Sequence, residues 1–101
     1  KSIRYIRKNL DKEIELEALA KVCCLSKDHF IRLFKKEMKT TPIKYINQKK
    51  IEKAQLMLFT GHRSVKDIAY ALAFNNVSFC DRLFKRFVGC TPIEYKENKH
   101  I

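Results

Sequence analysis

The chain of 101 residues has no tryptophan and only two glycines and two prolines. Small β-sandwiches and barrels need turn residues every ~8–12 positions, so this scarcity argues against them and favours long helices. No apolar run approaches the ~20 residues of a transmembrane helix. The opening KSIRYIRKNL lacks the apolar stretch of a signal peptide, and it has no initiator methionine. We therefore expect a piece of a longer protein.

Acidic residues are also scarce: 11 Asp and Glu stand against 22 Lys and Arg, a net charge of +11. The hydrophobic content of 46% is too high for a disordered basic tail. Such an excess of positive charge indicates a polyanionic partner. Nucleic acid is the first candidate, an anionic membrane surface the second, and a merely solvated surface the alternative. Residues 1–50 hold 14 basic and 6 acidic groups, and residues 51–101 hold 8 and 5.

Little in the sequence offers catalytic or metal chemistry. The cysteines, Cys23, Cys24, Cys80 and Cys90, have neither Cys-x-x-Cys nor Cys–His spacing, so no zinc site is predicted. We expect them to be small buried side chains in a reducing cytosol. The histidines are scattered, and no phosphate-binding loop or hydrolase motif is present. The sequence therefore predicts no enzyme, no cofactor and no metal.

The strongest internal signal is a duplication. LFKKEMKTTPIKY (33–45) aligns with LFKRFVGCTPIEY (83–95) at an offset of 50, with seven of thirteen positions identical. Upstream, Leu19-Ala20 aligns with Ile68-Ala69 at an offset of 49, so the second copy has one extra residue near Asn75-Asn76. Two copies are too few for a solenoid and indicate two related subdomains.

Apolar residues at helical spacing predict about seven helices and no strand. The predicted ranges are 3–9 after a cap at Ser2, then 16–22, 27–38, 42–59, 65–72, 77–88 and a short helix from 92. Capping side chains are expected at Ser2, Ser26, Thr41, Ser64 and Asn76, and left-handed stops at Gly61 and Gly89. The helix 42–59 would be ~27 Å long at ~1.5 Å per residue.

Each copy has the pattern of a helix-turn-helix unit: a small residue in the first helix, a second one four residues later, and apolar residues along the second helix. The pattern comprises Leu19, Ala20, Cys24, Leu25, Phe30, Leu33 and Phe34 in the first copy, and Ile68, Ala69, Ala73, Phe74, Cys80, Leu83, Phe84 and Phe87 in the second. Two matches in tandem are much more specific than one. Phe79 is expected in the core, or partly exposed against DNA.

These residues carry a family resemblance. Leu19-Ala20…Leu25-Ser26…Phe30-x-Arg32-x-Phe34-Lys35…Thr41-Pro42-x-x-Tyr45, repeated as Ile68-Ala69…Phe74…Phe79…Arg82-x-Phe84-Lys85…Gly89-x-Thr91-Pro92-x-x-Tyr95, resembles the DNA-binding domain of AraC/XylS-family transcription regulators. The resemblance covers essentially the whole chain. It implies an all-α domain in which two homeodomain-like helix-turn-helix subdomains, about 1–41 and 60–101, are joined by a long helix, about 42–59.

The resemblance also implies partners. These are double-stranded DNA read in two successive major-groove segments, RNA polymerase, and a sensor, dimerising or receiver domain elsewhere in the full-length regulator. Two positions depart from the family pattern, because Lys39 and Ala73 stand where glycine is usual. We therefore expect irregular local geometry after the helix 27–38 and in the second turn.

The outward faces of the two recognition helices supply the candidates for base contact. These are Lys27, Asp28, Ile31, Arg32, Asn76, Val77, Ser78 and Arg82, with Asp81 on the same face. Arg32 suits a guanine edge, a phosphate, or an ion pair with Asp28. Asp28 suits a cytosine amino group or the helix N-terminus, and Ile31 suits a thymine methyl or the core periphery. Arg82 suits a base or the DNA backbone, and Asn76 a cap first and a phosphate second.

Phosphate contacts are expected from basic residues around these helices, namely Lys35, Lys36, Lys44, Lys49, Lys85 and Arg86, with a solvated side chain as the alternative for each. The sequence thus predicts sequence-specific binding of double-stranded DNA by a bacterial transcription regulator in the cytoplasm. Two other functions remain open: a helical module that binds an acidic protein, and an RNA-binding adaptor.

Overall fold

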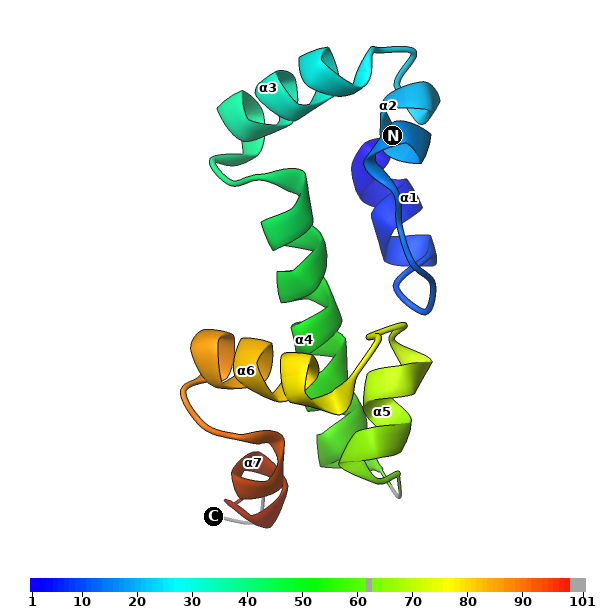
Figure 1. Ribbon diagram of the computed structural model, residues 1–101. Helices are drawn as coiled ribbons and strands as arrows, with labels where there is room; N and C mark the ends of the chain where they lie inside the picture. The colour runs from blue at the N-terminus through cyan, green and yellow to red at the C-terminus, as the bar shows by residue number, and fades with distance from the viewer. Residues whose placement is uncertain (62, 99–101) are drawn as a thin grey trace. The chain divides into compact units, whose positions relative to one another are not determined.

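The computed structural model describes residues 1–61 and 63–98, and within them it is entirely α-helical (Figure 1). The helices are α1 (Ser2–Lys8), α2 (Leu16–Val22), α3 (Lys27–Met38), α4 (Pro42–Thr60), α5 (Val65–Ala71), α6 (Val77–Val88) and α7 (Pro92–Asn98). The predicted all-α class is confirmed, and the predicted helix boundaries agree to within a residue wherever both ends were given.

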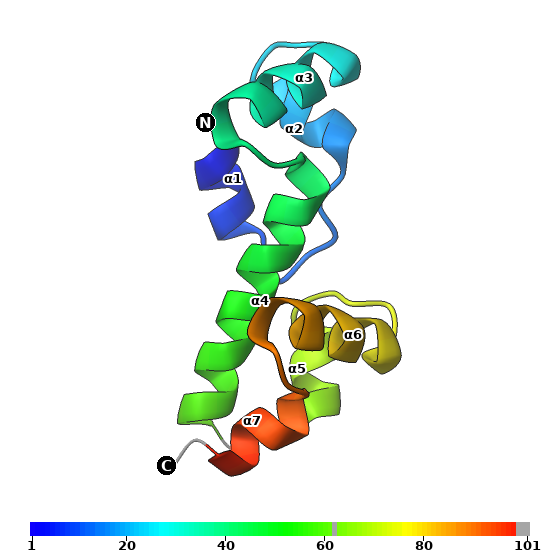
Figure 2. The same cartoon turned by 90° about the vertical axis from the view of Figure 1, so that its left-hand side faces the viewer.

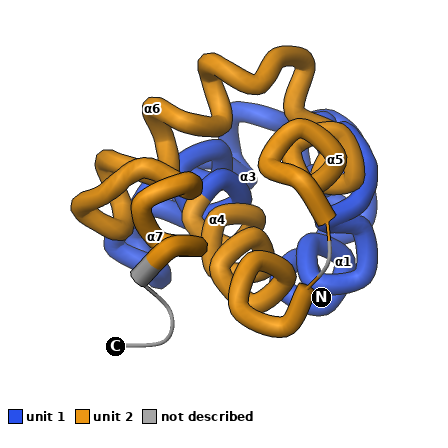
Figure 3. The backbone as a smooth tube through the Cα atoms, turned by 90° about the horizontal axis from the view of Figure 1, so that it is seen from below, with its two compact units in different colours: residues 1–47 blue, residues 48–101 orange. Residues whose placement is uncertain are grey.

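The chain divides into two compact units, residues 1–47 and 48–101 (Figure 3). Cut at this point, the sequence gives unit 1 12 basic and 6 acidic residues and unit 2 10 and 5. The unevenness between residues 1–50 and 51–101 therefore largely disappears, because Lys49 and Lys50 belong to the second unit. The finer division into 1–41, 42–59 and 60–101 stays a prediction.

In unit 1, helix α2 packs against both α1 and α3. Their apolar faces and the first turns of α4 enclose one core, made of Ile6, Leu10, Leu19, Ala20, Phe30, Phe34, Tyr45 and Ile46. Phe34 meets Tyr45 edge to face, with ring centroids 5.5 Å apart. This contact fixes the end of α3 against the start of α4.

Unit 2 repeats the arrangement, with α6 packed against α5 and α7 (Figure 2). The later part of α4 contributes Ile51, Ala54 and Leu58 to a core that includes Ile68, Ala69, Leu72, Phe74, Cys80, Leu83 and Phe84. Phe84 meets Tyr95 edge to face at 5.5 Å, the counterpart of the pair in unit 1. The repeat in sequence is therefore a repeat in packing.

Side-chain caps start most of the helices as predicted. Backbone N–H groups donate to Ser26 Oγ (from His29, 3.2 Å), Thr41 Oγ1 (from Lys44, 3.3 Å), Ser64 Oγ (from Asp67, 3.1 Å) and Asn76 Oδ1 (from Phe79, 2.7 Å). Ser2 is different: it is the first residue inside α1, Lys1 occupies the cap position, and no side chain caps this helix. The prediction for Ser2 is wrong because the helix begins one residue earlier.

The turn of each helix-turn-helix unit places an ordinary residue in the left-handed region, Cys24 at φ 57° and Ala73 at φ 61°. Each turn is closed by the same backbone bond, from Leu25 N–H to Ala20 O at 2.9 Å and from Phe74 N–H to Ala69 O at 3.0 Å. A glycine would adopt this φ without cost. The second turn is nevertheless regular with alanine, contrary to the expected irregularity.

Lys39 and Gly89 end α3 and α6 in the same way. Both are left-handed, at φ 63° and 99°, and their N–H groups donate to Lys35 O and Lys85 O at 3.0 and 2.9 Å. The end of α3 is therefore regular although it lacks glycine. Gly61 is not left-handed: a Cβ there would collide with the Met57 carbonyl, so the glycine serves close approach and not the predicted stop.

Of the four cysteines, all of which are free, only Cys80 is buried. Cys23 and Cys90 are half-buried, and Cys24 is exposed because it lies in the turn before α3. The expectation of buried cysteines is confirmed for Cys80 alone.

Candidate nucleic-acid interface

Helix α3 presents a basic outer face. Phe30 and Phe34 are buried, and the opposite side of the helix exposes Asp28, Arg32, Lys35 and Lys36. Lys27 is exposed in the first turn but lies in line with Phe34, so its predicted place on the outer face is corrected. Lys27 reaches Glu17 on α2, with Nζ 3.9 Å from the carboxylate, but both side chains are more than half exposed and such a pair contributes little. Among the described residues no ion pair joins Arg32 to Asp28. The arginine is thus available to an external partner.

Two apolar residues of α3 lie at the edges of the core. Ile31, a candidate for a thymine methyl, is half-buried and packs against the core of unit 1. Leu33, expected in the core, is 39% exposed. The helix is rotated so that Ile31 covers one edge of the core and Leu33 lies at the other edge. Of the two interpretations left open for Ile31, the structure supports the core periphery.

Helix α6 exposes Ser78 and Arg82 on its outer side, as predicted. Asn76 is exposed, but its amide oxygen is engaged in the cap, which leaves only its N–H₂ group for a ligand. Val77, a predicted base contact, is half-buried against the core of unit 2. Its predicted outward position is corrected because the first turn of α6 leans onto that core.

Phe79 lies at the surface of α6 with 38% of its area exposed. Its ring meets Phe74 edge to face at 6.0 Å, and the Arg82 guanidinium lies 5.9 Å from the ring centroid. This cation–π contact orients the arginine. Of the two positions expected for Phe79, the core is wrong and partial exposure agrees with the structure, where the ring supports the side chain of Arg82.

Asp81, predicted to point outward, is half-buried. Its Oδ1 atom is shielded from solvent and has no hydrogen-bond partner among the described residues. Burial raises the pKa of this carboxyl. Burial first, and the charge of Asp81 second, raise the pKa of the neighbouring Cys80 thiol to about 11. Because the folded state disfavours the charged carboxylate, Asp81 lowers stability as pH rises through its folded pKa.

The residues predicted to contact phosphates lie either at the ends of α3 and α6 or on α4. Lys35, Lys36, Lys85 and Arg86 are exposed in the last turns of α3 and α6, where cations also complement the helix dipole. Lys44 is exposed in the first turn of α4. Lys49 is half-buried and donates to Glu52 Oε1 at 3.2 Å, so it suits a phosphate less well than the others.

One buried lysine that supports the second unit is missed by the sequence analysis. Lys50 on α4 is only 5% exposed, its Nζ donates to the carbonyl of Leu72 at 2.7 Å, and it lies 5.5 Å from the centroid of the Phe74 ring. It thereby ties α4 to the turn that precedes α6. No sequence signal distinguishes it from the surrounding exposed lysines, since the burial arises from tertiary packing.

No helix within the described residues is long and apolar enough to cross a membrane. Nor do those residues bring together three His, Cys, Asp or Glu side chains that could hold a metal ion.

Comparisons with known proteins agree with this architecture. The helix-turn-helix domain family matches residues 19–98. The chain is 34% identical to the MmsAB operon regulatory protein of Pseudomonas aeruginosa and 33% identical to the bifunctional transcriptional activator/DNA repair enzyme AdaA of Bacillus subtilis, over 92% of its length in both cases. It spans 30% of the first relative and 44% of the second.

Three solved structures share the fold. An AraC-type regulator from Chromobacterium violaceum superposes with a TM-score of 0.90 at 20% identity, covering 97% of this chain and 88% of that one. The C-terminal domain of the response regulator yesN from Fusobacterium nucleatum gives 0.87 at 28%, covering 94% and 93%. The DNA-binding domain of AdpA, solved with a target DNA, gives 0.90 at 23%, covering 95% and 86%.

Proposed function

The chain belongs to the AraC/XylS helix-turn-helix family, and on this premise we propose that it is the sequence-specific, double-stranded DNA-binding part of a transcription regulator. One observation carries the proposal. The two repeats expose an arginine at the same place on the second helix of each helix-turn-helix unit, Arg32 on α3 and Arg82 on α6, followed by two adjacent basic residues. A groove-reading helix needs this combination of a guanidinium and flanking cations.

Each recognition helix enters a major-groove segment, and the basic residues at its end hold the phosphates. Arg32, unpaired with Asp28 and fully on the outer side, reads a guanine edge through two parallel hydrogen bonds. Arg82, held by Phe79, contacts the DNA backbone or a base. Ser78 and the Asn76 N–H₂ group add polar contacts. Ile31 and Val77 act mainly through packing.

The proposal extends to the whole regulator. This chain corresponds to less than half of the MmsAB and AdaA proteins, and we propose that a sensor or receiver domain elsewhere supplies the signal. RNA polymerase is the proposed partner in activation, and the bacterial cytoplasm the proposed location. The name of AdaA attributes DNA repair to that protein as a whole, whereas we assign no catalytic role to the residues of this chain.

The test is selection from a randomised duplex library, followed by anisotropy titration of the selected duplex over a salt series. We expect two short conserved blocks and a steep loss of affinity with salt through counterion release. Arg32→Ala should weaken binding by about 1–3 kcal/mol and relax one block alone. Lys36→Ala should weaken all sequences equally and reduce the salt slope by about 1.

Lys66→Ala, on an exposed lysine of α5 outside the proposed contacts, is the matched control and should change neither quantity. Single-stranded DNA and RNA serve as competitors. Salt-dependent binding without any consensus would favour the module that binds an acidic protein. Preference for RNA would favour the adaptor.

A further inference from the structure

Helix α1 carries a concentration of positive charge that the DNA-reading role does not use. Lys1, Arg4, Arg7 and Lys8 are all exposed, and residues 1–8 include no acidic residue. Within residues 1–61 and 63–98, no salt bridge joins any of these four side chains to a carboxylate. The charges of α1 are therefore not neutralised inside the described part of the chain.

This arrangement is locally unfavourable. Arg4 lies three residues from Lys1 and Arg7 and four from Lys8, and like charges at these spacings destabilise a helix. Lys1 and Arg4 also lie at the end where the helix dipole favours anions, and no side chain caps the helix. Unfavourable electrostatics that the rest of the fold does not offset are typical of a functional surface.

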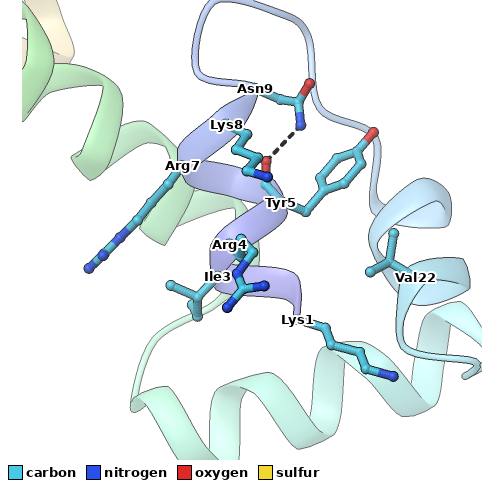
Figure 4. A pocket seen from close by; sticks show the side chains of 8 residues that line it. All are labelled: Lys1, Ile3, Arg4, Tyr5, Arg7, Lys8, Asn9 and Val22. Atoms are coloured by element: carbon cyan, nitrogen blue, oxygen red, sulfur yellow. Dashed lines mark hydrogen bonds between the residues drawn. The ribbon is translucent and has the colours of Figure 1, made fainter.

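A hollow of about 810 Å³ lies beside these cations (Figure 4). Its lining comprises Lys1, Ile3, Arg4, Tyr5, Arg7, Lys8, Asn9 and Val22. In Figure 4 the Tyr5 ring extends toward the side of α2 that carries Val22, while Lys1 and Arg7 extend in different directions from the helix. The Asn9 amide donates to the Tyr5 carbonyl at 2.7 Å and closes one end of the helix. Cations and apolar groups thus line the same hollow.

We propose that the α1 hollow docks an acidic segment of another polypeptide, in which carboxylates alternate with apolar side chains. The four cations provide charge complementarity. The remaining exposed parts of the half-buried Ile3, Tyr5 and Val22, the first two of which also pack against the core of unit 1, provide apolar contacts that a nucleic-acid phosphate does not need. Neutralising the cations would also remove the repulsion within α1. The docked segment would therefore stabilise the helix as well as bind to it.

Helices α1 and α3 pack on the same core, and Lys1 and Ile3 also line a second hollow with residues of α3. Ile6 of α1 and Phe30 of α3 belong to the same core of unit 1. Helical spacing then places Arg4 and Arg32 on the outer sides of their helices, each facing away from that core. We therefore expect a duplex bound through Arg32 to leave Arg4 and Lys8 of the α1 hollow accessible. Only this point rests on the proposed function.

The test uses the 101-residue chain and a fluorescein-labelled peptide of repeated Glu-Leu-Asp-Phe units. The double variant Arg4→Glu/Lys8→Glu should bind this peptide about tenfold more weakly, since two exposed ion pairs become repulsive. Lys53→Glu/Lys66→Glu, which changes the net charge equally on exposed sites of unit 2, is the control and should retain most of the affinity. Amide NMR shifts on adding the peptide should centre on α1 and Val22.

The same variants are titrated with the selected duplex and with vesicles of anionic phospholipid. Unchanged duplex affinity in the α1 double variant, to within about twofold after correction for net charge, supports a separate protein-docking surface. Equal losses for peptide and duplex would overturn the proposal in favour of a DNA phosphate surface, and α1-dependent vesicle binding would overturn it in favour of a membrane. Peptide binding that persists while duplex selection fails would refute the proposed function and leave this inference standing.

Discussion

The turns of the two repeats have the same backbone geometry, whereas the second helices that follow them pack differently. Both turns place a non-glycine residue in the left-handed region and close with the same backbone bond. The second helices differ, because Leu83 is buried whereas its counterpart Leu33 is 39% exposed. In unit 2, Phe87 and Val88 pack against the core, and the corresponding positions of unit 1 hold the exposed Glu37 and Met38.

The comparison shows which parts of the motif are constant. Geometry is retained at the turn, where backbone hydrogen bonds determine the angle between the two helices. Packing varies at the end of the second helix, where side chains can change without moving the turn. Differences between the units therefore offer direct ways to test what holds each recognition helix in place.

The largest effect is expected at Lys50, whose Nζ donates to the Leu72 carbonyl within unit 2. Lys50→Met should destabilise unit 2 by about 1–3 kcal/mol, because the buried carbonyl loses its partner. Urea unfolding followed through the amide signals of unit 2 measures the change. Lys53→Met, on the exposed side of the same helix, should stay within about 0.5 kcal/mol; equal effects would contradict a special role for Lys50.

Substitutions at the residues that end α3 and α6 should change the free energy of unfolding in opposite directions. Lys39→Gly should stabilise unit 1 by about 1 kcal/mol, because φ is 63° there and glycine removes the strain. Gly89→Ala should destabilise unit 2 by about 1–2 kcal/mol, since space is free but φ is 99°. Thermal unfolding of both variants gives the comparison, and two changes of the same sign would show that backbone strain is not the cause.

The smallest effect concerns the start of α7, where Thr91 and Glu94 cap each other. Glu94 Oε1 accepts from Thr91 N–H at 2.9 Å, and Thr91 Oγ1 accepts from Glu94 N–H at 3.2 Å. The bond from the Thr91 backbone is the main cause that holds the pKa of Glu94 below its ordinary value of 4.5. Its stabilising contribution is complete above that value and is lost as pH falls through the folded pKa.

In unit 1 the corresponding residue is Lys44, which lacks a carboxylate, so only half of this capping box exists. Lys44→Glu should complete it and stabilise α4 by about 0.3–1 kcal/mol at neutral pH, with the gain disappearing in acid. Urea titrations at neutral and acidic pH measure this, and Lys44→Gln separates the charge from the loss of lysine. A gain that survives acidification would contradict the mechanism.

The sequence predicts the helices well because their signals are local. Ser26 and Asn76 cap the recognition helices, Gly89 ends the second one, and apolar spacing identifies Phe30, Phe34 and Phe84 as core. It fails where tertiary contacts decide. The burial of Lys50, the enclosed oxygen of Asp81 and the exposed position of Leu33 depend on how far each helix rotates on its core, a few tens of degrees that a periodic pattern does not resolve.

The residues of the candidate interface also fall into two groups, those whose exposure the sequence predicts and those whose position depends on tertiary contacts. Exposure of Arg32, Arg82 and the basic residues near them follows from helical periodicity and was predictable. The half-burial of Ile31 and Val77 was not, because both lie at the boundary between the core and the outer face. The stacking of Arg82 on Phe79 needed the position of Phe74, which the turn supplies.

The exposed thiol in the first turn gives the molecule a selective chemical handle. A thiol reacts with electrophiles as its thiolate, so burial and a pKa of about 11 make Cys80 unreactive at neutral pH. Cys24 is exposed and lies two residues before the cap of α3. An alkylating spin label or fluorophore would therefore attach preferentially at the turn of unit 1, next to the proposed DNA-reading helix.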